Sequence, residues 1–204
     1  MNTDSRFQEK LNTLYQCIFG DVCKDDMTLV NKPCGHVVFE DLPEPLRLFY
    51  ATFADKKDFM KCLYDIKLPD EVAIENNIMI IARERQGVCA YGVEIDNGRV
   101  IYLDDSNRVA ESLNMQIDDF ILYLIAIQCS GFCSCTGKIY NCFSLLEESY
   151  RNQRITNNSD DGAVYFFGEG VILAVNGKDA YVSSKDDSIM ELFEEDTTFD
   201  VDYF

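Results

Sequence analysis

The chain has 204 residues, of which 47% are hydrophobic, so it is long enough to bury a sizeable core and does not have the composition of a disordered chain. Thirty-six acidic groups against eighteen basic ones give a net charge of −18, which repels phosphate backbones and anionic membranes. These values argue against direct binding to nucleic acid and favour a basic partner. The imbalance is greatest in residues 155–204, where twelve acidic residues face only Lys178 and Lys185, a net of −10.

Neither a membrane segment nor a secretion signal is indicated. No run of about eighteen apolar residues occurs, and residues 1–20 are polar and charged throughout, without a basic start followed by an apolar core. The nine cysteines are odd in number and scattered, several of them inside apolar patterns, which favours reduced thiols over a disulfide framework. We therefore expect a cytoplasmic protein.

Helical spacing dominates the first third of the chain. Residues 4–19 place an apolar stripe on one helix face, with Asp4 or Ser5 as cap and Gly20 just past the end. An irregular loop is expected over residues 21–39. A second helix begins at Leu42, because proline is tolerated in a first turn, and the segment 58–66 is predicted to continue it after a break.

From residue 77 the pattern becomes that of strands. Three successive runs, NIMIIARE (77–84), VCAYGVEI (88–95) and DNGRVIYL (96–103), predict a meander whose second turn has positive φ at both Asn97 and Gly98. Residues 112–128 predict a helix with Asn114 as a possible cap and Asp118 and Asp119 in its first turn. Because this helix is apolar almost all round, we expect it to be packed deeply against the sheet.

A second meander is predicted near the end of the chain, from AVYFF (163–167), VILAV (171–175) and AYVSS (180–184), the last two joined at Asn176–Gly177. A capping box opens a short helix over 188–193, and residues 196–204 are expected to form a mobile acidic tail. The predicted fold class is α+β, with a mainly antiparallel mixed sheet of about six strands flanked by helices. Whether the two meanders form one sheet or two stays open.

The order of these pieces resembles the SUKH superfamily. The resemblance rests on the helix that begins with Leu42-Pro43, the turn ERQG (84–87) leading into VCAYGV, a strand ending in YLDD, and the helix SLNMQIDDFI. It covers residues 42–128 best, and the strand and helix over 180–193 are also similar. Members often carry tryptophan where this chain has Tyr91, which supplies a large ring with one polar end instead.

The resemblance implies a single SUKH-like domain over residues 1–204 and no enzymatic activity. Members are best known as bacterial immunity proteins, encoded beside polymorphic or contact-dependent toxins, many of which are nucleases. The implied function is therefore to bind and neutralise a cognate toxin, with no cofactor, no membrane and no direct contact to nucleic acid. A regulatory or scaffold protein of the same fold is the alternative, and the oligomeric state stays open.

For the stretch around Glu84 we predict a structural role in a hairpin turn. Gly87 near the end of a hairpin connection suits positive φ and a bulge, polar neighbours such as Glu84 can bond exposed backbone N–H groups, and Tyr91 fills core. A catalytic Glu84 would need a second acid or base, for which Glu94 and Asp104 are the candidates on neighbouring strands.

A metal- or thiol-dependent enzyme is the less favoured alternative. The only histidine, His36, follows Cys34 by two residues, with Cys23 upstream and four cysteines downstream at 129, 133, 135 and 142. Thiolate and imidazole are zinc ligands, yet the chain has no C-x-x-C pair and these spacings match no common finger or ribbon. We therefore predict neither a metal site nor a catalytic residue.

For the binding hypothesis, the partner is a basic, nuclease-type toxin met by an acidic surface. Acidic side chains would take the place of phosphates in its active site, steering encounter and supplying charge-assisted bonds. The candidate contact residues are Glu194, Glu195 and Asp196, with Phe199 or Phe193 as apolar anchor.

Overall fold

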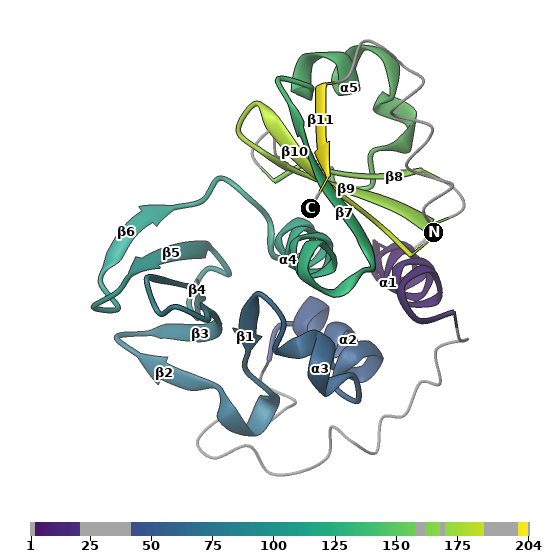
Figure 1. Ribbon diagram of the computed structural model, residues 1–204. Helices are drawn as coiled ribbons and strands as arrows, with labels where there is room; N and C mark the ends of the chain where they lie inside the picture. Colours follow the sequence, from purple (N-terminus) through teal and green to yellow (C-terminus); the bar gives the residue numbers. More distant parts are fainter. Residues whose placement is uncertain (1–2, 21–41, 158–161, 168–169, 186–199, 204) are drawn as a thin grey trace.

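The computed structural model describes residues 3–20, 42–157, 162–167, 170–185 and 200–203, which form an α+β fold (Figure 1). None of the helices in these ranges combines the length and apolar character needed to cross a membrane. The helices are α1 (Thr3–Phe19), α2 (Glu44–Phe53), α3 (Lys57–Met60), α4 (Ile117–Phe132) and α5 (Phe143–Ser149), with 3-10 turns at Pro69–Glu71 and Arg151–Gln153.

The first meander lies in a six-stranded antiparallel sheet, the first sheet, with strand order β1-β3-β4-β5-β6 and β2 also paired to β3. Its strands are β1 (Tyr64–Ile66), β2 (Ala73–Glu75), β3 (Ile78–Glu84), β4 (Cys89–Glu94), β5 (Val100–Asp104) and β6 (Val109–Ser112). The apolar run of β3 is buried on both faces, since Met79 and Ile81 enter the main core while Ile78 and Ile80 enter a separate cluster.

The second meander belongs to a separate, five-stranded antiparallel sheet, the second sheet, in the order β11-β7-β10-β9-β8. Its strands are β7 (Cys135–Tyr140), β8 (Val164–Phe167), β9 (Val171–Asn176), β10 (Asp179–Ser184) and β11 (Asp200–Tyr203). Alternation along β9 sends Ile172 and Ala174 toward the main core, and Leu173 and Val175 toward a cluster that includes Leu146 of α5. The two meanders therefore form two sheets.

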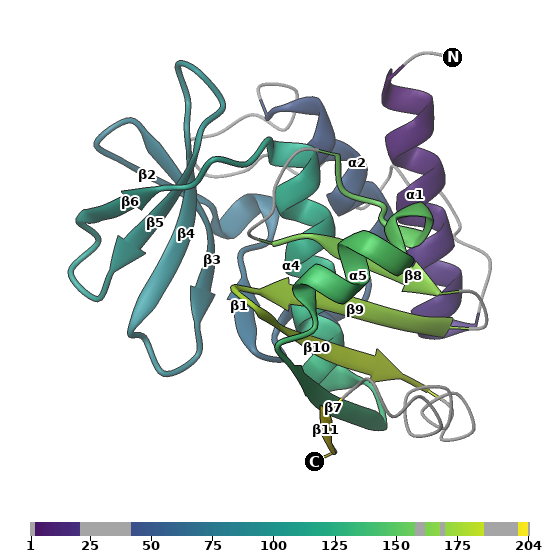
Figure 2. The same cartoon turned by 90° about the horizontal axis from the view of Figure 1, so that it is seen from above.

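Helix α4 lies between the two sheets in both views (Figures 1 and 2). It packs on β9 and β10 of the second sheet and on α2 and α3, and its Phe120 ring lies 5.3 Å from the ring of Tyr91 on β4. Ten of its residues are buried, as the all-round apolar pattern predicts. α5 covers the opposite face of the second sheet.

Several local predictions are wrong at their ends. The segment 58–66 does not stay helical, because α3 ends at Met60 and β1 pairs with β3 instead. Asn114 is not the cap of α4, whose N-cap is Gln116 in an extended conformation. Within the expected tail, β11 pairs with β7, so residues 200–203 are an ordered strand.

The turn after β4 also differs from its prediction. In this turn only Gly98 has positive φ (70°), and five residues separate β4 from β5. The Asn97 side chain stabilises this longer turn, since it donates to the Glu94 carboxylate (2.7 Å) and accepts the Arg99 N–H (2.9 Å). A turn with two positive-φ residues occurs instead at Asn76 and Asn77 (φ 50° and 66°), between β2 and β3.

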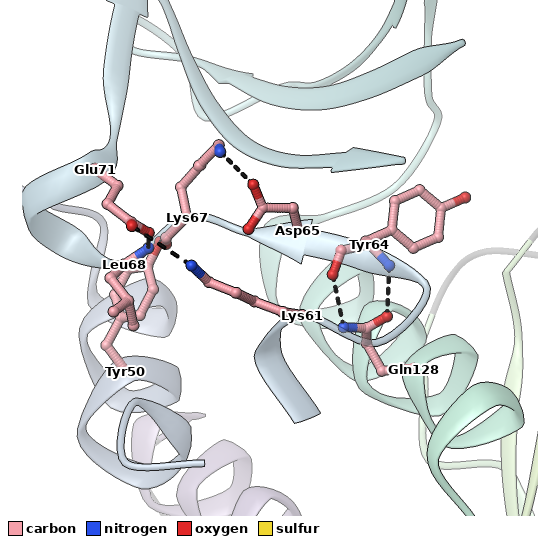
Figure 3. A network of polar contacts seen from close by, with 8 residues as sticks. All are labelled: Tyr50, Lys61, Tyr64, Asp65, Lys67, Leu68, Glu71 and Gln128. Atoms are coloured by element: carbon pink, nitrogen blue, oxygen red, sulfur yellow. Dashed lines mark hydrogen bonds and ion pairs between the residues drawn. The ribbon is translucent and has the colours of Figure 1, made fainter. Parts of the chain in front are cut away.

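Gln128 attaches β1 to α4 (Figure 3). Its side chain is fully buried, and its Oε1 accepts the backbone N–H groups of Leu63 (3.0 Å) and Tyr64 (2.8 Å). Its Nε2 donates to the carbonyls of Phe59 (2.7 Å) and Tyr64 (3.0 Å). All four hydrogen-bonding positions of the amide are thus used, which explains why the chain leaves its helix after α3.

We predict that Gln128→Leu lowers the free energy of unfolding by about 3 kcal/mol, because buried backbone groups lose their partners. Urea unfolding followed by circular dichroism measures this as a lower midpoint. Gln16→Leu, at an exposed position of α1, is the matched control and should leave the midpoint nearly unchanged. Equal midpoints for the two variants would contradict the role given to Gln128.

Candidate functional site

The ERQG turn is built around the Glu84 carboxylate. Its Oε2 accepts the backbone N–H groups of Gln86 (2.8 Å) and Val88 (3.5 Å), while the N–H of Gly87 donates to the Glu84 carbonyl (2.8 Å). Gly87 has a φ of 79°, as the hairpin pattern predicts. The structure thus shows the positive φ predicted for Gly87 and the backbone contacts predicted for Glu84, whereas the irregularity in the β3–β4 ladder lies between Ile80 and Ala82 and not at Gly87.

Asp104 and Glu94, the other two carboxylates considered for catalysis, each stabilise a turn through hydrogen bonds. Asp104 accepts the backbone N–H groups of Ser106 and Arg108 (2.9 Å each) and pairs with the Arg108 guanidinium (2.9 Å). The backbone N–H of Arg108 is the main cause that lowers the pKa of Asp104. Glu94 accepts from Asn97, and alternation places it on the face of β4 opposite to Tyr91.

A cavity of about 560 Å³ opens beside the ERQG turn, within the size range of ligand-binding clefts. We call it the tyrosine cleft, because it is lined by five of the eleven tyrosines of the chain. Its walls come from β1, β3, β4, β5, α4 and the β9–β10 hairpin. The lining residues are Leu63, Tyr64, Glu84, Cys89, Tyr91, Tyr102, Tyr123, Ile127, Ser130, Asn176 and Tyr181.

Three of the tyrosines form a connected row along the first sheet. The rings of Tyr64 and Tyr91 lie 5.5 Å apart, and those of Tyr91 and Tyr102 lie 5.6 Å apart. Burial raises the pKa of Tyr64 to about 12, against a smaller lowering by its hydrogen bond with Tyr91, and burial raises the pKa of Tyr91 further still. Their hydroxyls therefore stay protonated at neutral pH, and the row is uncharged.

Among the described residues that line the cleft, Glu84 is the only one with a formally charged side chain. Its two arginine neighbours are directed elsewhere. Arg83 crosses the other face of the sheet to the side chain of Asn107 (2.5 Å), and Arg85 reaches the carbonyl of Cys62 (3.3 Å). The cleft therefore combines neutral aromatic walls with one negative charge.

The structure brings together some of the predicted residues. Glu84 and Tyr91 both line the cleft, whereas Glu194, Glu195, Asp196 and Phe199 lie outside the described residues, as does Phe193. Tyr102 was not predicted as a site residue. The predicted meander nevertheless places it opposite Tyr91, its partner in the β4–β5 ladder. No sequence signal joins Tyr123 on α4 and Tyr181 on β10 to this row, because their approach depends on the packing of the two sheets.

Four cysteines gather near the end of α4. Burial is the main cause that raises the pKa of Cys17, to about 11, and of Cys62 and Cys129, while a hydrogen bond with Cys129 lowers the pKa of Cys133. Cys135 is the first residue of β7, and Cys142 is the N-cap of α5. Within the described ranges, no three metal-ligating side chains lie close enough to hold an ion. Cys23, Cys34 and His36 lie outside these ranges.

We predict that Gly87→Ala lowers the free energy of unfolding by about 1 kcal/mol, because alanine is strained at positive φ. The space around the position is open, so no steric clash adds to this cost. Gly87→Asn should cost less, since asparagine adopts this conformation more readily. Urea unfolding compares the three proteins, and an alanine variant as stable as the wild type would contradict the assignment.

A pH dependence follows from the raised pKa of Tyr64. Its stabilising effect is complete below pH 10, the ordinary tyrosine pKa, and is lost as pH rises toward about 12. In Tyr64→Phe, the decline of the unfolding free energy above pH 10 should be shallower, by at most about 1.4 kcal/mol per pH unit. Urea unfolding over this range measures it. Below pH 10 the two proteins should differ by a constant amount, and equal slopes above it would refute the prediction.

Comparison of the chain with models of protein families, with curated proteins and with solved structures yields no match.

Proposed function

We propose that this protein is an immunity-type inhibitor, which binds and neutralises a basic, nuclease-type toxin through its acidic surface. The observation that carries the proposal is the tyrosine cleft, an open aromatic cavity with a negative charge on its wall. The SUKH resemblance of residues 42–128 supplies the class of partner. The proposal assigns the protein a binding role and no catalytic one.

The charge of the chain supports a basic partner. A net charge of −18 on 204 residues attracts cationic proteins over distances comparable to the Debye length and raises their association rate. Such long-range attraction brings a partner to the surface but does not by itself select one surface patch. A short-range anchor is needed in addition.

The tyrosine cleft has the features expected of such a short-range anchor. Tyrosine is enriched at the energetic centres of protein interfaces, because its ring gives a large contact area with little loss of conformational entropy. The five tyrosines of the lining are all half-buried, so their rings are already held in place while part of each stays accessible. A partner side chain entering the cleft would meet a preformed site.

The test is a calorimetric titration of the full chain with the toxin domain encoded beside it. We expect tight binding that weakens at least about tenfold between about 50 and 500 mM salt, since the attraction is screened. Reversing the charges of Glu194, Glu195 and Asp196 to lysine should weaken binding further.

The matched control reverses the same number of charges at Glu75, Asp96 and Asp105, which are exposed on the first sheet. If the affinity is indifferent to salt and to both sets of substitutions, the acidic surface is not the binding surface. If no binding is measured at all, the immunity assignment fails.

A further inference from the structure

Within the part of the chain that the structure describes, the carboxylate of Glu84 has no cationic side chain as a partner. Among the described residues it takes part in no ion pair, although arginines precede and follow it in the chain. Strand alternation sends Arg83 to the opposite face of the first sheet, where it bonds Asn107, and Arg85 bonds the Cys62 carbonyl. The negative charge of Glu84 is therefore available to pair with a cationic group that enters the tyrosine cleft.

The carboxylate is also held in one orientation. Its Oε2 is bound by the N–H groups of Gln86 and Val88, whereas Oε1 has no hydrogen-bond partner within the described part of the chain. Tyr64 faces Glu84 directly in the β1–β3 ladder, so one wall of the cleft pairs an aromatic ring with this charge. An oriented acceptor beside a ring is arranged for a ligand that both stacks and donates hydrogen bonds.

The aromatic row completes the arrangement. The rings of Tyr91 and Tyr102 are inclined by 61° and those of Tyr64 and Tyr91 by 54°, so neighbouring rings meet at a steep angle and do not stack face to face on one another. Ring faces attract cations, and this attraction grows where water is excluded. The lining residues in the described ranges include no lysine or arginine that would oppose a cationic ligand.

We propose that the tyrosine cleft is a recognition site for a guanidinium group, taken from an arginine side chain of the basic protein partner. This inference rests on the proposed function for the source of the arginine, but not for the chemistry of the site. Guanidinium is favoured over ammonium because it is planar, stacks on aromatic rings, sheds water more easily and donates from a fixed fork. In the cleft it stacks on the tyrosines and donates to Oε1 of Glu84.

The test uses small probes on the full chain, with no toxin present. N-acetyl-arginine amide, its citrulline counterpart and N-acetyl-lysine amide are titrated while the ring signals of isotope-labelled tyrosines are followed by NMR. We expect the arginine probe to shift the signals of Tyr64, Tyr91 and Tyr102, with an affinity at least about tenfold above those of the other two probes. Equal affinities, or shifts confined to other tyrosines, would overturn the inference.

Two variants locate the charge that is responsible. Glu84→Gln keeps an oxygen for the turn but removes the charge, and it should weaken binding of the arginine probe about tenfold. Glu94→Gln is the matched control, because Glu94 supports a hairpin turn on the other face of the same sheet, and it should bind as the wild type does. The comparison of arginine with citrulline on the wild-type protein stands even if the Glu84 variant is unstable.

The results separate this inference from the proposed function. Arginine binding without toxin binding would support the guanidinium site and reject the immunity role. Toxin binding that is unaffected by Glu84→Gln and by excess arginine probe would support the immunity role and reject the guanidinium site.

Discussion

The burial of α4 is the constraint on which the rest of the structure depends. This helix is apolar on nearly all sides, so it is stable only if other elements cover it in every direction. The second sheet covers one side, α2 and α3 another, and the first sheet reaches it through Tyr91. The apolar side chains on the different sides of α4 therefore determine where the two sheets pack. The tyrosine cleft is the space where neither sheet covers α4 completely.

The sequence predicted most of what depends on local pattern. The α+β class, α1 with Gly20 after it, the central strands β3 to β5, the later meander and the long buried helix all follow from periodicity and turn chemistry. What it could not predict depends on distant partners. β1 is only three residues long. It is held in place by Gln128, 64 residues later, whose side chain forms hydrogen bonds with the backbone N–H and carbonyl of Tyr64. β7 was not predicted, although Thr136, Lys138 and Tyr140 alternate along it; its partners β10 and β11 lie about 40 or more residues later in the chain.

The candidate site divides in the same way. Glu84, Gly87 and Tyr91 were found because a hairpin is a local structure whose geometry a few residues determine. The opposite wall, with Tyr123 and Tyr181, comes from elements whose distance from β4 no periodicity encodes. The cleft is thus a property of how three layers meet. Its chemical character therefore depends on how the two separate sheets and α4 pack together.

The ERQG turn has a consequence for how this protein could change over time. Glu84 and Gly87 hold the hairpin tip from inside, whereas Arg85, Gln86 and Val88 are exposed around it. Gln86 and Val88 contribute to the turn through their backbone N–H groups, which any residue but proline supplies. Exchanges at these three positions alter the exposed surface next to Glu84, which lines the cleft, while the contacts of Glu84 and Gly87 stay in place. Under the proposed function, the hairpin tip is where selectivity among related partners can diverge at little cost to stability.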